Sequence, residues 1–139
     1  MKKKVQVVIL TPENQTLVFK TNRDRGSFWQ NVTGSVDTDE DFLEAAIREL
    51  CEETGLESQN AREHIVALNT EFFFTDRKER NVHEKVYYYF GPQWEVTMSD
   101  EHVDYKWMNA SEVTIGFFKY HSNFQALEKS LEKLSQDLK

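Results

Sequence analysis

Cysteine is almost absent from this chain of 139 residues, in which Cys51 stands alone. A single cysteine cannot form a disulfide within the chain, so the composition gives no sign of an oxidising compartment, and a cytoplasmic location is expected. Long apolar runs are lacking as well, since no window approaches the roughly 18 to 20 apolar residues of a membrane span. We therefore expect no membrane association.

The start of the chain is not expected to be a signal peptide. Three lysines precede the apolar residues 5–10, which resembles the basic opening of such a segment. The apolar run is too short, however, and Gln6 interrupts it. We interpret these residues as a first β-strand.

Positive charge is the scarcer sign: 17 lysine and arginine residues stand against 24 aspartate and glutamate residues, which gives a formal net charge of −7. A negative chain is repelled by the backbone of nucleic acids, so duplex nucleic acid is not an expected partner. A small phosphate ligand is still compatible with this charge, because a few basic side chains and bound divalent cations can supply positive charge locally.

Apolar residues make up 39% of the chain and aromatic residues 13%, enough for one core, so we expect residues 1–139 to form a single domain. Runs rich in valine, isoleucine, phenylalanine and tyrosine, separated by turn-forming residues, predict β-strands. They cover residues 5–10, 16–21, 65–74, 86–90 and 94–98. The charged stretch 75–81 between two of them is expected to be an exposed loop.

Two helices are predicted from apolar residues that recur at spacings of three and four. The first covers about residues 39–54, with Thr38 or Asp39 as its N-cap and Gly55 as a left-handed C-terminal cap. The second covers about residues 122–138 and would lie on a sheet. Strands on both sides of a central helix, followed by a closing helix, indicate an α+β fold, an α/β/α sandwich with a mixed sheet.

Three glutamates gather on the first predicted helix. At about 100° per residue, Glu49, Glu52 and Glu53 fall within a sector of roughly 100°, where their charges repel one another. Near the C-terminal end of a helix they also oppose the macrodipole. A solvated acidic face is one interpretation, and a bound cation that relieves the repulsion is the other. Hard oxygen ligands suit Mg²⁺, for which Mn²⁺ can substitute.

These glutamates belong to a longer motif that begins at Gly34. Its pattern is glycine, five residues, glutamate, seven residues, Arg-Glu, an aliphatic residue, any residue, Glu-Glu, any residue, glycine and an aliphatic residue. The matching positions are Gly34, Glu40, Arg48, Glu49, Leu50, Glu52, Glu53, Gly55 and Leu56. The segment resembles the Nudix box. This resemblance implies a Nudix fold, with the box as a loop–helix–loop, and hydrolysis of a nucleoside diphosphate linked to another group.

The resemblance also implies roles for individual residues of the box. Glu49 and Glu53 would bind the metal ion, with Glu52 as an additional ligand or a supporting carboxylate. Arg48 would orient the glutamate beside it, and Glu40 would brace the loop against the helix.

Three shorter segments, residues 28–36, 101–107 and 122–126, resemble one Nudix subfamily, the bacterial dihydroneopterin triphosphate pyrophosphatases of the folate pathway. By this resemblance Glu101 is a further metal ligand on a loop, and a solvated loop carboxylate is the alternative. His102 beside it is expected at the surface.

Several side chains could bind the substrate. The subfamily carries paired arginines at the end of the second strand, where this chain has Asn22 between Thr21 and Arg23. Gly34 marks a turn at which the backbone passes close to metal or phosphate, since glycine alone allows this without steric cost. Aromatic side chains could stack on a base or pterin. The candidates for substrate binding are Arg23, Arg25, Thr33, Lys4, Trp29 and Phe74.

We expect a pyrophosphohydrolase in which Glu49, Glu53 and Glu101 hold one or more Mg²⁺ ions that neutralise a polyphosphate and lower the pKa of the attacking water. Glu49 or Glu52 would accept the proton. The expected substrate is dihydroneopterin triphosphate or a dNTP, cleaved to monophosphate and pyrophosphate by a monomer or homodimer. Hydrolysis of RNA 5′ ends or dinucleoside polyphosphates, and a non-catalytic nucleotide-sensing module, are the alternatives.

Overall fold

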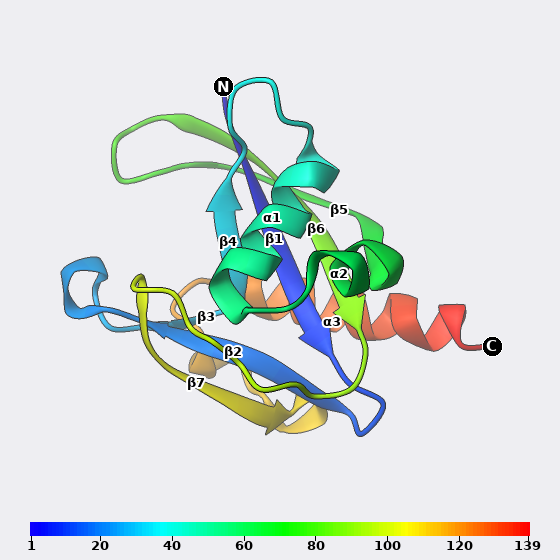
Figure 1. The fold of residues 1–139 in the computed structure, drawn as a ribbon. Coiled ribbons are helices and arrows are strands. Elements are labelled where there is room, and N and C mark those ends of the chain that lie inside the picture. Colours follow the sequence, from blue (N-terminus) through cyan, green and yellow to red (C-terminus); the bar gives the residue numbers. More distant parts are fainter.

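The computed structural model describes residues 1–139 and contains a mixed β-sheet with helices on both faces (Figure 1). The strands are β1 (Lys2–Leu10), β2 (Gln15–Thr21), β3 (Trp29–Gln30), β4 (Val32–Ser35), β5 (Ile65–Thr75), β6 (Asn81–Phe90) and β7 (His102–Asn109). The helices are α1 (Phe42–Thr54), α2 (Ser58–His64) and α3 (His121–Asp137). Short 3₁₀ helices are η1 (Arg23–Arg25), η2 (Ala110–Glu112) and η3 (Ile115–Phe117).

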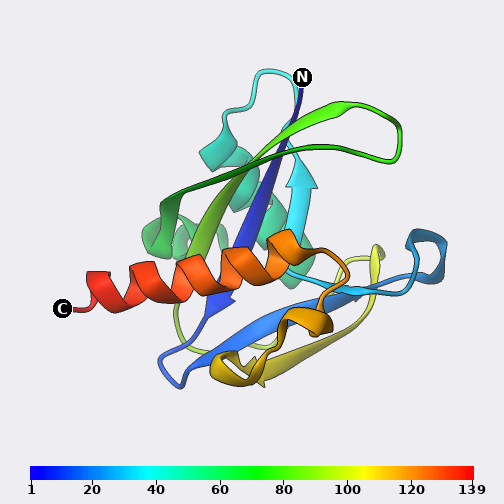
Figure 2. The same cartoon turned by 180° about the vertical axis from the view of Figure 1, so that it is seen from behind.

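Strand β1 is the centre of the sheet. It pairs in parallel with β6 along its whole length and antiparallel with β4 and the start of β2. Strand β5 continues the sheet beyond β6, and β7 and β3 flank β2. Figures 1 and 2 show α1 and α2 on one face of β1 and β6 and α3 across the opposite face.

The alternation of side chains along β1 produces two cores, because successive residues of a strand face opposite sides. Val5, Val7 and Ile9 pack with α1, whereas Val8 and Leu10 pack in a separate cluster with residues of α3. The expected α+β sandwich with a mixed sheet is therefore confirmed.

Most of the predicted strands are confirmed, but the one at residues 94–98 is wrong. This segment is extended and joins no sheet, because its polar groups bind the end of α1. Trp94 Nε1 and the backbone N of Thr97 each donate to the carbonyl oxygen of Thr54, at 3.0 Å. The predicted loop at 75–81 is the turn of the β5–β6 hairpin, whose strands continue to Thr75 and from Asn81.

Helix α1 begins later than predicted. Its N-cap is Asp41, whose carboxylate accepts a hydrogen bond from the backbone N of Glu44 at 2.7 Å, and neither Thr38 nor Asp39 caps it. Asp39 instead adopts a positive φ of 70° within the loop that precedes the helix. Gly55 ends α1 in the left-handed conformation as predicted, with φ of 74°. No helix combines the length and apolar character required to cross a membrane.

Candidate active site

Arg48 joins the loop before α1 to the helix itself. Its guanidinium donates to both carboxylate oxygens of Glu40, at 2.8 and 3.0 Å, and to the carbonyl oxygen of Ser35, at 2.8 Å. A fourth hydrogen bond, of 2.9 Å, reaches Glu49 Oε1. The planar fork of arginine suits such bidentate binding. Arg48 therefore fixes the position of Glu49 relative to the loop.

Glu49 is buried against the backbone of Gly34. A Cβ atom at position 34 would overlap the Glu49 carboxylate, so only glycine permits this approach. Burial raises the pKa of Glu49 to about 7, while the hydrogen bond from Arg48 acts in the opposite direction. The glutamate thus lies within the protein, in contact with the backbone of β4, and not on a solvated helix face.

Glu53, one turn further along α1, is held by side chains from the segment that leads into β7. Ser99 Oγ donates to Glu53 Oε2 at 2.9 Å, and His102 Nδ1 lies 2.7 Å from the same oxygen. Burial raises the pKa of Glu53, but hydrogen bonds with His102, Glu101 and Ser99 lower it overall. A hydrogen bond with Glu53, followed by burial, raises the pKa of Glu101.

His102 is buried, which corrects the expectation of a surface histidine. Its side chain is 2% exposed and packs against Phe19 with ring centroids 5.0 Å apart. Its Nε2 lies 3.2 Å from the amide nitrogen of Gln30. An amide nitrogen can only donate, so with this orientation of Gln30 Nε2 is the acceptor, and Nδ1 is the ring nitrogen that faces Glu53. Sequence reasoning missed this role because it depends on the pairing of β7 with β2.

The carboxylates of Glu49, Glu52, Glu53 and Glu101 are the candidate ligands for a divalent cation. No three acidic, histidine or cysteine side chains converge as in a complete metal site, and Glu52 is exposed, with one oxygen 3.4 Å from Arg48. The chemistry of the set nevertheless fits Mg²⁺ or Mn²⁺, because every carboxylate supplies hard oxygen donors.

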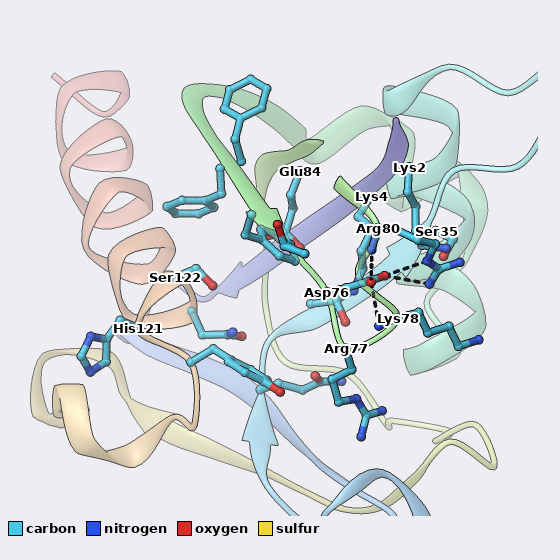
Figure 3. A pocket seen from close by; sticks show the side chains of 18 of the residues that line it. Lys2, Lys4, Ser35, Asp76, Arg77, Lys78, Arg80, Glu84, His121 and Ser122 are labelled. Atoms are coloured by element: carbon cyan, nitrogen blue, oxygen red, sulfur yellow. Dashed lines mark hydrogen bonds and ion pairs between the residues drawn. The ribbon is translucent and has the colours of Figure 1, made fainter. Parts of the chain in front are cut away.

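A cleft of about 590 Å³ opens on the α3 face of the sheet (Figure 3). Its basic side chains are Lys2, Lys4, Arg25, Arg77, Lys78 and Arg80, and its acidic ones are Asp76 and Glu84. His121 and Ser122 of α3 lie on one side, and the turn of the β5–β6 hairpin lies on the other. The cleft is therefore a concentration of positive charge in a negatively charged protein.

Strand register explains the floor of the cleft. Lys4 of β1 pairs with Ser35 of β4 on one side and with Glu84 of β6 on the other, and Glu84 pairs in turn with Phe72 of β5. Directly paired residues point to the same face of a sheet. These four residues thus form one row across four strands, and all of them line the cleft.

Strand β4 connects the cleft with the carboxylates of α1. Thr33 and Ser35 line the cleft, whereas Gly34 between them faces Glu49 on the opposite side of the sheet. Arg25, which also lines the cleft, lies 3.9 Å from Glu101 Oε2. A ligand in the cleft is thus separated from the acidic side chains only by one short edge strand.

Four of the predicted substrate-binding residues line this cleft, namely Lys4, Arg25, Thr33 and Phe74. Two do not. Arg23 is exposed on η1, and Trp29 stacks on Phe117, with ring centroids 5.6 Å apart. Trp29 packs there because its side chain belongs to the second core, beneath Lys106.

The prediction also lacked several residues that line the cleft. Arg77, Lys78 and Arg80 were recognised as charged but not as part of a site, and Glu84 lay outside the predicted strand 86–90, which in the structure begins at Asn81. The sequence did contain a signal for Glu84. This carboxylate stands at a position that the alternation of side chains along a strand places on the buried face.

Comparisons with known proteins agree with this geometry. The NUDIX domain profile matches residues 1–131. The chain is 30% identical to the dihydroneopterin triphosphate diphosphatase of Haemophilus influenzae, over 94% of this chain and 87% of the relative. It is 28% identical to the RNA pyrophosphohydrolase of Pelagibacter ubique, over 94% of this chain and 92% of that protein.

A solved structure gives the same result. The dihydroneopterin triphosphate pyrophosphohydrolase of Escherichia coli superposes with a TM-score of 0.78 and 27% identity, over 91% of this chain and 92% of that one. The NUDIX profile thus matches residues 1–131, which include the glutamates of α1 that Arg48 and His102 hold in place. The chain belongs to the Nudix family of pyrophosphohydrolases.

Proposed function

We propose that the protein hydrolyses dihydroneopterin triphosphate or a dNTP to the monophosphate and pyrophosphate, with Mg²⁺ as its cofactor. The main support is that successive residues of β4 face opposite sides of the sheet. The basic cleft lies on one side, and the glutamates of α1 lie on the other. The volume of the cleft, about 590 Å³, lies within the range of sites for a single small ligand. The Haemophilus influenzae relative supports the pterin substrate.

Nudix hydrolases generally use divalent metals. Glu49, Glu53 and Glu101 would hold the ion, with Glu52 as a further or supporting ligand. When bound, the ion would neutralise polyphosphate charge and acidify the attacking water. The close approach of Glu49 to the backbone of Gly34 would bring an ion held by that carboxylate near β4.

The remaining roles belong to the protein's own side chains. Arg48 holds Glu49 in place, and His102 holds Glu53. Arg25 and Arg77 would bind the phosphates, because both are basic and line the cleft. Glu52 is the exposed glutamate of α1 in this site and would accept the proton of the attacking water, with Glu49 as the alternative.

A second candidate is the removal of pyrophosphate from RNA 5′ ends, which the Pelagibacter ubique relative suggests. The net charge of −7 and a cleft sized for a single small ligand favour a free triphosphate over a polynucleotide.

A panel of substrates in Mg²⁺ tests the proposal. Dihydroneopterin triphosphate, the four dNTPs, ADP-ribose, Ap4A and 5′-triphosphorylated RNA would be compared, with chromatography to separate monophosphate from diphosphate products. We expect pyrophosphate and a monophosphate from the pterin or a dNTP, and none in EDTA. Preferential turnover of ADP-ribose or RNA, or no pyrophosphate from any free triphosphate, would contradict it.

A further inference from the structure

We propose that Glu84 determines substrate specificity by accepting hydrogen bonds from a ring N–H and the neighbouring exocyclic amino group of a 2-amino-4-oxopyrimidine ring. This ring is shared by guanine and the pterins. The inference rests on the proposed function, which it refines by naming a chemical group of the substrate.

The first observation is that Glu84 is a buried carboxylate on the floor of the cleft. The residue is 3% exposed, yet it lines the cleft together with Lys4 and Phe72 on the adjacent strands. Figure 3 shows it among the side chains that line the cleft. Burial of an ionised carboxylate is costly unless several hydrogen bonds compensate it. A carboxylate in this position therefore requires an explanation.

The second observation is a chain of hydrogen bonds that fixes what Glu84 can bind. Asn123 Oδ1 accepts from the backbone N of Asn31 at 2.8 Å, and Asn31 Nδ2 donates to Gln6 Oε1 at 2.8 Å. The amide oxygen of Gln6 is thus occupied, and its amide nitrogen donates to Glu84 Oε1 at 2.9 Å. All of these residues are buried. The chain orients Gln6 so that Glu84 must present an acceptor to it.

The third observation is that most of the accepting capacity of Glu84 is unused. The bond from Gln6 is its one hydrogen bond, and no ion pair within 4.0 Å engages it. An ionised carboxylate can accept about four hydrogen bonds. Burial raises the pKa of Glu84, whereas the charge of nearby Lys4 lowers it. Two N–H donors from a ligand would supply the missing bonds and stabilise the ionised form.

The neighbours of Glu84 suit the rest of such a ring. Lys4, in register with Glu84, carries a donor that matches the 4-oxo group of a pterin or the 6-oxo group of guanine. Phe72, in register on the other side, provides an aromatic surface. Adenine presents a ring nitrogen acceptor where guanine has an N–H, so it would place a lone pair against the carboxylate. The site therefore selects against adenine as well as for guanine.

Kinetics with base analogues test the inference. kcat/KM would be measured for dGTP, dITP, dATP and dihydroneopterin triphosphate with the wild type and with Glu84→Gln. dITP lacks the exocyclic amino group, so the wild type should prefer dGTP over it by at least ~10-fold, as expected for a hydrogen bond to a charged group. Glu84→Gln should reduce turnover of dGTP and the pterin at least ~10-fold and shrink the dGTP:dITP and dGTP:dATP ratios. Whichever of dGTP and dihydroneopterin triphosphate the wild type hydrolyses with the higher kcat/KM identifies guanine or pterin as the natural ring.

The matched control is Glu71→Gln on neighbouring β5, since Glu71 is exposed, pairs with His83 and lies outside the cleft. It should leave all ratios unchanged. If Glu84→Gln lowers turnover of every substrate equally, Glu84 is only a structural partner of Gln6 and the inference is overturned. A wild type that does not distinguish dGTP from dITP overturns it without any variant.

Binding separates this inference from the proposed function. Calorimetric titration with dGMP, dIMP and dAMP in EDTA measures recognition of the ring without hydrolysis. If the wild type binds dGMP selectively and Glu84→Gln does not, the role of Glu84 in recognising the ring is supported. This holds even if the protein cleaves no triphosphate. If Glu84→Gln does not fold, Glu84→Asp takes its place, because aspartate keeps the charge but has a shorter side chain. Glu84→Asp should weaken the binding of dGMP more than that of dAMP. Equal weakening of both would overturn the inference.

Discussion

Arg48 binds both carboxylate oxygens of Glu40, with Nε 2.8 Å from Oε2 and Nη2 3.0 Å from Oε1. The same guanidinium reaches the carbonyl of Ser35 and the carboxylate of Glu49. One side chain therefore holds the loop, the edge strand and a candidate metal ligand in a single arrangement. The guanidinium of Arg48 is thus a cation of the chain itself, around which the acidic side chains of α1 are arranged.

Replacing Arg48 by lysine should disrupt this arrangement, because a lysine ammonium cannot form the planar fork. We expect Arg48→Lys to lower kcat by ~10-fold or more and to lower the melting temperature. Arg62→Lys is the matched control, since Arg62 forms a similar fork with Glu44 at 2.8 and 3.0 Å but lies exposed on α2. Steady-state kinetics on both variants would decide, and equal effects would show that Arg48 has no special role.

Removing a candidate metal ligand should abolish turnover and preserve the fold. Glu53→Gln or Glu49→Gln is expected to lower kcat by at least ~10²-fold, because a lost charged ligand costs several kcal/mol of transition-state stabilisation. Circular dichroism should be unchanged. Glu44→Gln, on the exposed side of the same helix, is the control. Near-normal turnover of either site variant at saturating Mg²⁺ would refute the metal site.

A methyl group at position 34 should displace Glu49. The Cβ of Gly34→Ala would overlap the Glu49 carboxylate, and the backbone beneath it is fixed by pairing with β1. We expect both activity and melting temperature to fall. Gly116→Ala is the control, because a Cβ there meets no atom within 4 Å. An active, fully stable Gly34→Ala variant would mean that Glu49 moves without consequence for catalysis.

His102 should matter for both stability and metal binding. His102→Ala removes a buried partner of Glu53, and an unpaired buried group costs about 1–3 kcal/mol. We expect a lower free energy of unfolding and a higher Mg²⁺ requirement. Glu101→Gln should raise the Mg²⁺ requirement with little loss of stability, because Glu101 is exposed. Urea unfolding and Mg²⁺ titration of activity would separate the two, with exposed His64→Ala as a control.

Helix α1 and its glutamates were predictable because helical periodicity and a long motif coincide in one segment. Strand β4 was missed because it is only four residues long and contains Gly34, which weakens any strand pattern. Residues 94–98 look like a strand, but their hydrogen bonds go to Thr54 and not to a ladder. Sequence pattern does not reveal where backbone groups find their partners.

The cleft could be predicted only in part for a related reason. Lys4 and Glu84 are 80 positions apart and become neighbours only through the parallel register of β1 and β6. Likewise, Trp29 and Arg25 are close in sequence, yet only Arg25 lines the cleft, since Trp29 packs on Phe117. The residue types indicated which side chains could bind a substrate. The register of the strands determines which of these side chains line the cleft.

The raised pKa of Glu84 predicts a specific dependence of stability on pH. Burial raises the pKa of this group above its ordinary value of 4.5 in the folded protein. The folded state therefore holds a proton that the unfolded chain has released, so this contribution to stability is complete below pH 4.5 and is lost as the pH rises through the folded pKa. Glu84→Gln has no such proton.

The free energy of unfolding of Glu84→Gln minus that of the wild type should consequently grow as the pH rises from about 4.5 through the raised pKa of Glu84. Each unit by which the pKa is raised adds about 1.4 kcal/mol to this difference. Urea unfolding of both proteins at fixed ionic strength across this range would measure it, and taking the difference cancels the other titrating groups. Lys4, the basic neighbour on β1, opposes the shift, so Lys4→Gln should steepen the wild-type dependence. Parallel profiles for the wild type and Glu84→Gln would show that Glu84 is ionised throughout.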